Sequence, residues 1–274
     1  MPIRVYWWKN VFNFGDWLTP YLLEKWGLHF EYASLRSAQL ISVGSTLSMT
    51  LNVFDLLWRA KKLVVLGSGL MFNPQWSMTY YLRLQFLDIR LVRGELTKMA
   101  LLKFIQRNIP CGDPGLLASS FYNKELVAKA YSVGLIPHHS RYEQFAKLTL
   151  PIGWRLIDPR TSKCEAVFEN ICQCELIMSE SLHGLVVADS FEIPNVWLYN
   201  TDLHVGGDFK FRDYFSSIDR SPSLCYRVED LSEIVTVTPS HLFRQSFQMN
   251  PKKLQGIKET ILGEFNRYAQ SKVF

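Results

Sequence analysis

The sequence lacks the features that mark membrane-spanning, exported and nucleic-acid-binding proteins. None of its apolar runs reaches the roughly 18–20 residues that cross a bilayer, and its first residues lack the basic-then-apolar order of a signal peptide. The net charge is +5, but the basic residues are scattered and form no basic tract. We therefore expect a cytoplasmic protein with no nucleic-acid partner. The basic excess favours general solubility, and attraction to a small anion or to the inner face of the cytoplasmic membrane is the alternative.

Cysteine and glycine patterns exclude two further classes. The five cysteines cannot all pair within one chain, and Cys172-Gln173-Cys174 has the wrong spacing for a zinc knuckle. We expect free, mostly buried thiols and no metal site. Gly67-Ser68-Gly69 lacks the full glycine fingerprint of dinucleotide-binding proteins, which argues against a nicotinamide enzyme.

Short apolar runs alternate with helix-like stretches along most of the chain, which has 48% hydrophobic residues. Cys174 to Leu198 shows the unit most clearly, as a buried strand, a polar turn, a helix opening near Leu182 and a second strand. The pattern predicts an α/β protein with two doubly wound, Rossmann-like domains and mainly parallel sheets. We place the domains at residues 1–125 and 126–250, with a connector after Tyr226 and a closing amphipathic helix at 251–274.

Polar residues follow the ends of the predicted strands in both halves. A single such residue is usually a cap or a turn former, and Asp16 is a candidate helix N-cap. Their recurrence at nearly every strand end instead indicates a shared site in the cleft between the halves. They are Asn13, Gly15, Asp16, Ser68, Gly69, Arg93, Asp113, His138, Ser181 and His183.

Three stretches carry the candidate chemistry. Ser181 and His183 stand where a helix begins, so a hydroxyl, an imidazole and the positive end of a helix dipole could meet an anion there. His138 and His139 should point to opposite sides, as adjacent residues at a strand end do, and the sequence does not say which faces the cleft. The stretch from Lys210 to Phe215, which includes Arg212, fits a solvated loop or an anion clamp equally well.

Taken together, these motifs resemble the polysaccharide pyruvyl transferase family, in particular its short bacterial members that place pyruvate ketals on exopolysaccharide or capsule sugars. The matching stretches occur in family order over residues 5–220, and the Ser-Leu-His-Gly stretch is the most specific. They are Asn13-Phe-Gly-Asp16, Val65-Leu-Gly-Ser-Gly69, Val92-Arg-Gly-Glu-Leu-Thr97, Gly112-Asp-Pro114, Gly134-Leu-Ile-Pro-His138, Leu156-Ile-Asp-Pro159, Ser179-Glu-Ser-Leu-His-Gly184 and Lys210-Phe-Arg-Asp213.

The resemblance implies a GT-B-like fold with the acceptor side in the first domain and the donor side in the second. It implies a transferase that uses phosphoenolpyruvate as donor substrate, needs no cofactor and acts on a glycan, typically a lipid-linked oligosaccharide at the membrane. Many members carry an arginine where this chain has Ser181, so Arg93, Lys210 or Arg212 would supply the missing cation.

On this hypothesis each candidate residue has a role. His183 holds the phosphate and the leaving-group oxygen with help from Ser181, and Arg93 binds the carboxylate or phosphate. His138 transfers a proton and Asp16 orients or deprotonates the acceptor hydroxyl, whereas Asp113 holds a loop or an arginine. The remaining substrate-binding candidates are Asn13, Gly15, Ser68, Gly69, Lys210 and Arg212. A nucleotide-sugar glycosyltransferase of GT-B type and a non-catalytic glycan-binding module are the alternatives.

Overall fold

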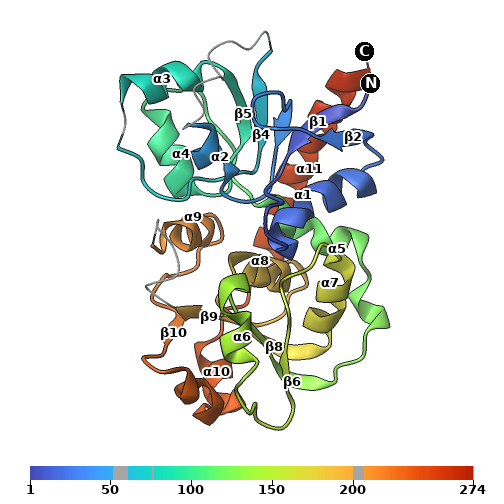
Figure 1. The fold of residues 1–274 in the computed structure, drawn as a ribbon, viewed down its shortest axis with the longest axis vertical. Coiled ribbons are helices and arrows are strands. Elements are labelled where there is room, and N and C mark those ends of the chain that lie inside the picture. Colours follow the sequence, from blue (N-terminus) through green and yellow to red (C-terminus); the bar gives the residue numbers. More distant parts are fainter. Residues whose placement is uncertain (52–60, 76, 200–206, 274) are drawn as a thin grey trace.

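The computed structural model of this protein describes residues 1–51, 61–75, 77–199 and 207–273. It contains two five-stranded sheets, one in each half of the chain, and every strand pairing is parallel. The two halves lie one above the other, with the termini close together at one end (Figure 1). The predicted pair of doubly wound α/β halves is therefore confirmed at the level of the two parallel sheets.

The first half holds five strands and the helices that connect them. Its strands are β1 (Ile3–Tyr6), β2 (Phe30–Tyr32), β3 (Leu40–Ile41), β4 (Leu63–Leu66) and β5 (Leu87–Leu91). Its helices are α1 (Phe14–Lys25), α2 (Thr46–Thr50), α3 (Met78–Leu84), α4 (Glu95–Leu102) and α5 (Ala118–Phe121), and a 3₁₀ turn at Pro114–Leu117 precedes α5.

The second half repeats this plan. Its strands are β6 (Tyr131–Ile136), β7 (Trp154–Leu156), β8 (Cys174–Ser179), β9 (Asn195–Tyr199) and β10 (Cys225–Arg227). Its helices are α6 (Tyr142–Phe145), α7 (Cys164–Cys172), α8 (Leu182–Ser190), α9 (Phe209–Ser217), α10 (Pro239–Gln245) and α11 (Pro251–Val273). None of the helices among the described residues combines the length and apolar character that crossing a bilayer requires.

The two sheets have the same topology. Their orders are β2-β1-β3-β4-β5 and β10-β9-β8-β6-β7, so in each sheet the first strand lies between the second and the third. The order reverses between β1 and β3 in one sheet and between β6 and β8 in the other. Ligands of doubly wound proteins bind at this switch point, beyond the carboxyl ends of the strands.

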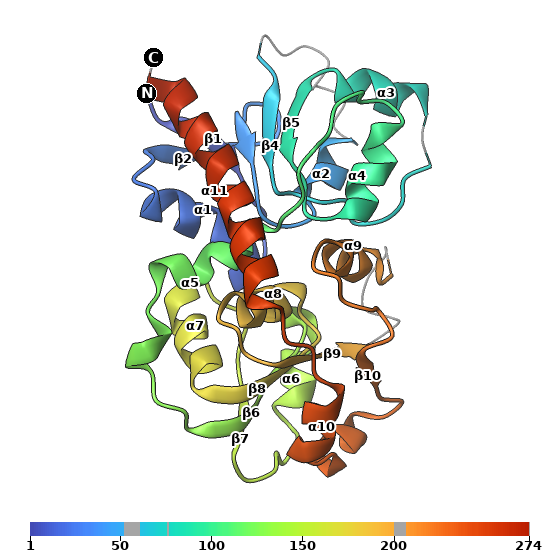
Figure 2. The same cartoon turned by 180° about the vertical axis from the view of Figure 1, so that it is seen from behind.

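One continuous core joins the halves. It includes Leu18 of α1, Val186 of α8 and Ile261 of α11. Helix α11 leaves the second half and runs along the back of the first (Figure 2), where Phe265 stacks on Trp26 at a ring separation of 4.3 Å. The halves are therefore held together by buried apolar contacts as well as by polar ones.

One prediction about local structure was wrong, and one of two alternatives left open is excluded. The residues after Tyr226 are not a simple connector, because they form a 3₁₀ stretch (Leu231–Thr236) and α10. Leu242 of α10 is buried in a hydrophobic cluster with residues of the second sheet. The stretch from Lys210 to Phe215 is not a solvated loop. It forms α9, because Phe211 and Phe215 lie four residues apart and bury the same face of a helix.

Candidate functional site

A cavity of about 440 Å³ lies between the two halves, and its lining residues follow β1, β3, β4, β6, β8 and β9. Its volume is within the range of small-molecule sites. Both halves contribute lining residues, so both switch points open onto the same space. The lining consists of Trp8, Asn13, Asp16, Gly44, Ser45, Thr46, Ser48, Met49, Met71, Phe72, His138, His139, Ser181, Leu182, His183 and Lys210.

The first half brings the N-terminus of α1 to the cavity. Asn13, and not Asp16 as predicted, is the N-cap, because its Oδ1 accepts a hydrogen bond from the Gly15 N–H at 3.4 Å. The other end of the Asn13 amide donates to Asp16 Oδ2 at 2.9 Å. Burial raises the pKa of Asp16 to about 6, although the Asn13 hydrogen bond and the charge of Lys210 oppose the shift.

The second half brings the N-terminus of α8 to the same place. Ser181 is its N-cap residue and His183 lies in its first turn. The His183 ring packs against Gly15, where a Cβ would lie only 2.1 Å from His183 Nδ1. Gly15 therefore allows the N-termini of α1 and α8 to meet, and any side chain at that position would displace the imidazole.

His183 is neutral in this environment. Burial lowers the pKa of its imidazole to about 3, and the nearby positive charges of Lys210 and Arg93 act in the same direction. A bound anion would offset those charges and make a second proton on the ring easier to hold.

Both histidines of the His138-His139 pair line the cavity, so the prediction that they point to opposite sides was wrong. The reason is that β6 ends at Ile136, and His138 already caps a 3₁₀ turn, which lets the two rings lie 4.1 Å apart. The His138 N–H donates to Glu180 Oε2 at 3.1 Å, and Glu180 Oε1 accepts from Arg141 at 2.7 Å. This buried ion pair fixes the backbone of the His138 turn.

Lys210 is the lysine of the cavity lining. It lies in the first turn of α9, and no described residue forms a hydrogen bond or an ion pair with its ammonium group. Burial lowers the pKa of Lys210 to about 7, with the charge of Arg93 adding to the effect and Asp16 opposing it. An unpaired, partly desolvated cation of this kind is suited to binding an anion.

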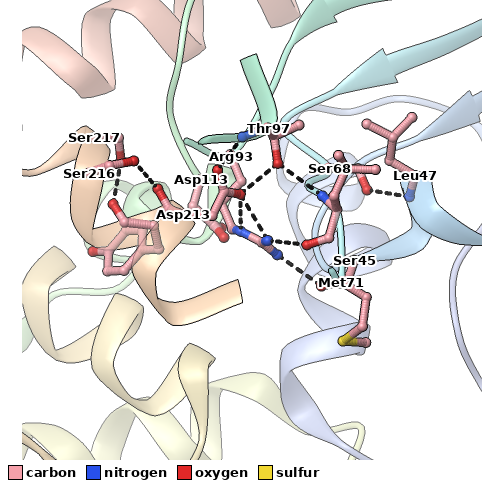
Figure 3. Close-up of polar contacts among 12 residues, drawn as sticks. Ser45, Leu47, Ser68, Met71, Arg93, Thr97, Asp113, Asp213, Ser216 and Ser217 are labelled. Carbon is pink, nitrogen blue, oxygen red and sulfur yellow. Dashed lines mark hydrogen bonds and ion pairs between the residues drawn. The ribbon is translucent and has the colours of Figure 1, made fainter. Parts of the chain in front are cut away.

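Arg93 is not among the cavity-lining residues and is fully buried; Figure 3 shows its polar contacts. Its Nε donates to Asp213 Oδ2 at 3.0 Å, one terminal nitrogen donates to the Ser45 hydroxyl at 2.9 Å and the other donates to the Leu70 carbonyl at 2.6 Å. A ligand would have to displace these partners to reach the guanidinium. The geometry therefore favours a supporting role for Arg93 over the predicted direct contact with the donor.

Asp213 of α9 also caps a helix of the other half. Its Oδ1 accepts from the Thr97 N–H at 2.7 Å and its Oδ2 accepts from the Thr97 hydroxyl at 2.8 Å, at the N-terminus of α4 (Figure 3). The N-cap residue of α4, Gly94, has no side chain to do this, and a Cβ there would lie 1.7 Å from the Asp213 carbonyl oxygen. Asp213 is thus bound by Arg93 and Thr97, and Gly94 leaves the space that its backbone needs.

The remaining predicted site residues do not line the cavity. Ser68 is fully buried, and its hydroxyl bonds to Thr46, the Leu47 N–H and the Gly44 carbonyl. Ser68 therefore holds the loop of residues 44–46, which lines the cavity. Gly69 makes room for the Arg93 guanidinium. Arg212 is exposed on α9.

The sequence did not indicate several residues that line or support the cavity. The apolar part of the lining, Met49, Met71 and Phe72, carries no motif that could have indicated it. Glu180 stood within a motif, but its pairing with Arg141 depends on how the chain turns after β6 and β8.

Comparison with known proteins places the chain in a family. A sequence model described as polysaccharide pyruvyl transferase matches residues 2–202. The succinoglycan biosynthesis protein ExoV of Rhizobium meliloti is 29% identical over 79% of this chain and 65% of its own length. An uncharacterised protein of Acanthamoeba polyphaga mimivirus is 30% identical over 57% of this chain and 55% of its own length. The chain thus spans less than two thirds of the length of either relative.

Among solved structures, an uncharacterised protein of Klebsiella pneumoniae matches with a TM-score of 0.47 and 12% identity, over 84% of this chain and 93% of its own. The family match covers most of the chain and includes every motif from Asn13 to His183. The chain belongs to the polysaccharide pyruvyl transferase family.

Proposed function

We propose that this protein transfers the pyruvyl group of phosphoenolpyruvate to a sugar of an exopolysaccharide or capsular repeat unit and forms a pyruvate ketal. The observation that carries the proposal is the cavity, in which three histidines, two helix N-termini and a lysine without a carboxylate partner among the described residues converge in a member of this family. Such a set of groups suits a small, highly charged anion.

Lys210 is the residue we assign to the donor anion. The family resemblance implies an arginine at the position of Ser181 in many members, and Lys210 is the lining residue that can supply that charge here. Arg93 has its guanidinium bonded to Asp213, Ser45 and Leu70, and Arg212 is exposed on α9. The N-termini of α1 and α8 add N–H groups and positive dipole ends to the same site.

The division of the lining supports a donor side and an acceptor side. The second half contributes Lys210 and the three histidines, whereas the first half contributes Asp16 and an apolar surface. Trp8, Met49, Met71 and Phe72 form that surface, which suits the C–H face of a sugar ring. We propose a GT-B-like arrangement in which residues 1–125 bind the acceptor, a lipid-linked oligosaccharide, and residues 126–250 bind the donor.

The chemistry needs an acid, a base and a cradle for phosphate. A proton adds to C3 of the donor, one sugar hydroxyl attacks C2 and loses its proton, and the C2–O bond to phosphate breaks. A neighbouring hydroxyl then closes the ring at C2, so one of the two hydroxyl protons replaces the proton used at C3 and the other leaves with phosphate. We assign proton transfer at C3 to His138, the leaving phosphate to His183 with Ser181, and the acceptor hydroxyl to Asp16.

Incubation of the protein with phosphoenolpyruvate, with and without candidate acceptor glycans, tests this function. Release of inorganic phosphate only when an acceptor is present supports pyruvyl transfer. Release of nucleotide from a UDP-sugar with the same acceptors would instead indicate a glycosyltransferase. Glycan binding without release of either product would indicate a non-catalytic module.

A further inference from the structure

Two buried polar atoms that have no hydrogen-bond partner among the described residues face each other beside the cavity. They are Asp113 Oδ2 and His183 Nε2, which lie 3.9 Å apart. The Asp113 side chain is fully buried and that of His183 is 9% exposed. Buried polar atoms are rarely left unpaired, so their mutual orientation calls for an explanation.

The carboxylate of Asp113 is held in a fixed orientation. Its Oδ1 accepts a hydrogen bond from the Gly115 N–H at 2.9 Å, as the N-cap of the 3₁₀ turn at Pro114–Leu117. Because Oδ1 is occupied in this way, Oδ2 is the oxygen left to face His183.

The imidazole of His183 is held from its other side. A Cβ at Gly15 would meet Nδ1 at 2.1 Å, so the Nδ1 edge of the ring lies against Gly15 at the N-terminus of α1. Nε2 therefore faces the carboxylate, whereas Nδ1 lies on the side of α1, whose first turn lines the cavity.

We propose that Asp113 is a positioning residue that keeps the proton of neutral His183 on Nε2 and so leaves Nδ1 as the nitrogen that exchanges protons in the cavity. The opposite tautomer would point the Nε2 lone pair at the carboxylate oxygen, which is unfavourable. The functional half of this inference rests on the proposed function, but the tautomer itself does not.

The charged groups around the pair are consistent with this role. Lys210 of α9 and Arg93 act on His183, whereas Arg93 and Asp213 act on Asp113. Burial raises the pKa of Asp113 to about 6, so the carboxylate is ionised at pH 8. When an anionic donor offsets Lys210, His183 gains a second proton on Nδ1, and Asp113 stabilises the resulting imidazolium.

The tautomer can be measured directly by NMR on the full chain labelled with ¹⁵N-histidine at pH 8, with His183→Gln identifying the signal. We expect the ¹⁵N pattern of an Nε2–H imidazole for His183 in the natural protein. A protonated Nδ1, or an even mixture of tautomers, overturns the proposal. This measurement needs neither turnover nor a stable Asp113 variant.

Asp113→Asn provides the second arm. The Gly115 N–H keeps the amide oxygen at the Oδ1 position, so the amide NH₂ faces Nε2 and should move the ring proton to Nδ1. We expect kcat to fall by about 10²–10⁴-fold with the KM for phosphoenolpyruvate nearly unchanged, as when a buried aspartate that orients a catalytic histidine is replaced. An unchanged tautomer in this variant contradicts the proposal.

Asp219→Asn is the matched control, because Asp219 is largely exposed and lies outside the cavity lining. It should leave both the tautomer and kcat unchanged. If the natural chain shows the Nε2–H tautomer but releases no phosphate with any acceptor, the proposed function fails while the role of Asp113 in holding the ring stands.

Discussion

At the level of single residues, burial moves the pKa values of an acid and a base in the cavity toward each other. The pKa of Asp16 rises to about 6 and that of Lys210 falls to about 7. In both cases burial disfavours the charged form, and this effect outweighs the stabilisation of the charge by neighbouring groups. Both groups therefore change charge near neutral pH. His183 stays neutral over this range, since its pKa falls to about 3. Donor binding should respond to pH through Lys210.

The first prediction concerns that response. Lysine is charged below its pKa, so phosphoenolpyruvate should bind more tightly at pH 6 than at pH 8.5, by about tenfold for one charge-assisted contact. Isothermal titration calorimetry measures the two dissociation constants. Lys210→Arg should remove most of the dependence because a guanidinium stays charged, and Lys210→Met should bind weakly at both pH values. The same pH dependence in all three proteins would show that Lys210 does not bind the donor.

At the level of elements, α9 of the second half supplies polar partners that the first half lacks at Arg93 and at the N-terminus of α4. It presents Lys210 to the cavity from its first turn and inserts Asp213 beside Arg93, one turn later, at the N-terminus of α4. Ser216 of α9 adds a further bond, accepting from the Glu95 N–H at 3.1 Å. Arg93 in turn donates a hydrogen bond to Ser45, which lines the cavity.

The second prediction follows from this contact. Asp213→Ala leaves Arg93 buried without its charge partner and α4 without its cap, so the free energy of unfolding should fall by about 3–5 kcal/mol. Urea unfolding followed by circular dichroism gives the value. Asp219→Asn, at an exposed aspartate paired with Lys253, should cost less than about 1 kcal/mol, because asparagine also tolerates the left-handed backbone of this position. Equal losses in the two variants would mean that the Arg93–Asp213 pair does not stabilise the contact between the halves.

At the level of the whole molecule, two sheets of identical strand order place their switch points on either side of one cavity. Helix α11 secures this arrangement from the back. At Gly112, in the family motif after α4, an added Cβ would lie only 2.8–3.0 Å from the side chains of Ile257 and Ile261 of α11. The closing helix thus belongs to the core of the first half although the chain enters it from the second.

The third prediction tests that helix. Phe265 is 1% exposed and stacks on Trp26, so Phe265→Ala should lower the free energy of unfolding by about 3–5 kcal/mol. Phe243 is 40% exposed, and Phe243→Ala should cost less than about 1 kcal/mol. Both values come from the same urea titration. A loss at Phe265 no greater than at Phe243 would indicate that α11 does not hold the first half.

The sequence predicted the parts of this molecule that local pattern controls. Buried parallel strands have apolar runs and end in polar loops, and the carboxyl ends of neighbouring strands share an edge, so residues as distant as Asp16 and His183 could be assigned to one cleft. The three-residue edge strands β2 and β10 are too short and too polar to show such a run. The Arg93–Asp213 pair joins residues 120 positions apart, and nothing in either motif indicates that these two side chains would bind each other.

The most direct test of the central claim is a crystal structure of this protein grown with phosphoenolpyruvate. The account predicts the donor in the cavity between the halves, with an anionic group within hydrogen-bond distance of Lys210 Nζ and another at the N-terminus of α8 near Ser181. Arg93 should keep its bonds to Asp213 and Ser45 in that complex. A donor bound to Arg93 in place of Asp213, or bound outside the cavity, would contradict it.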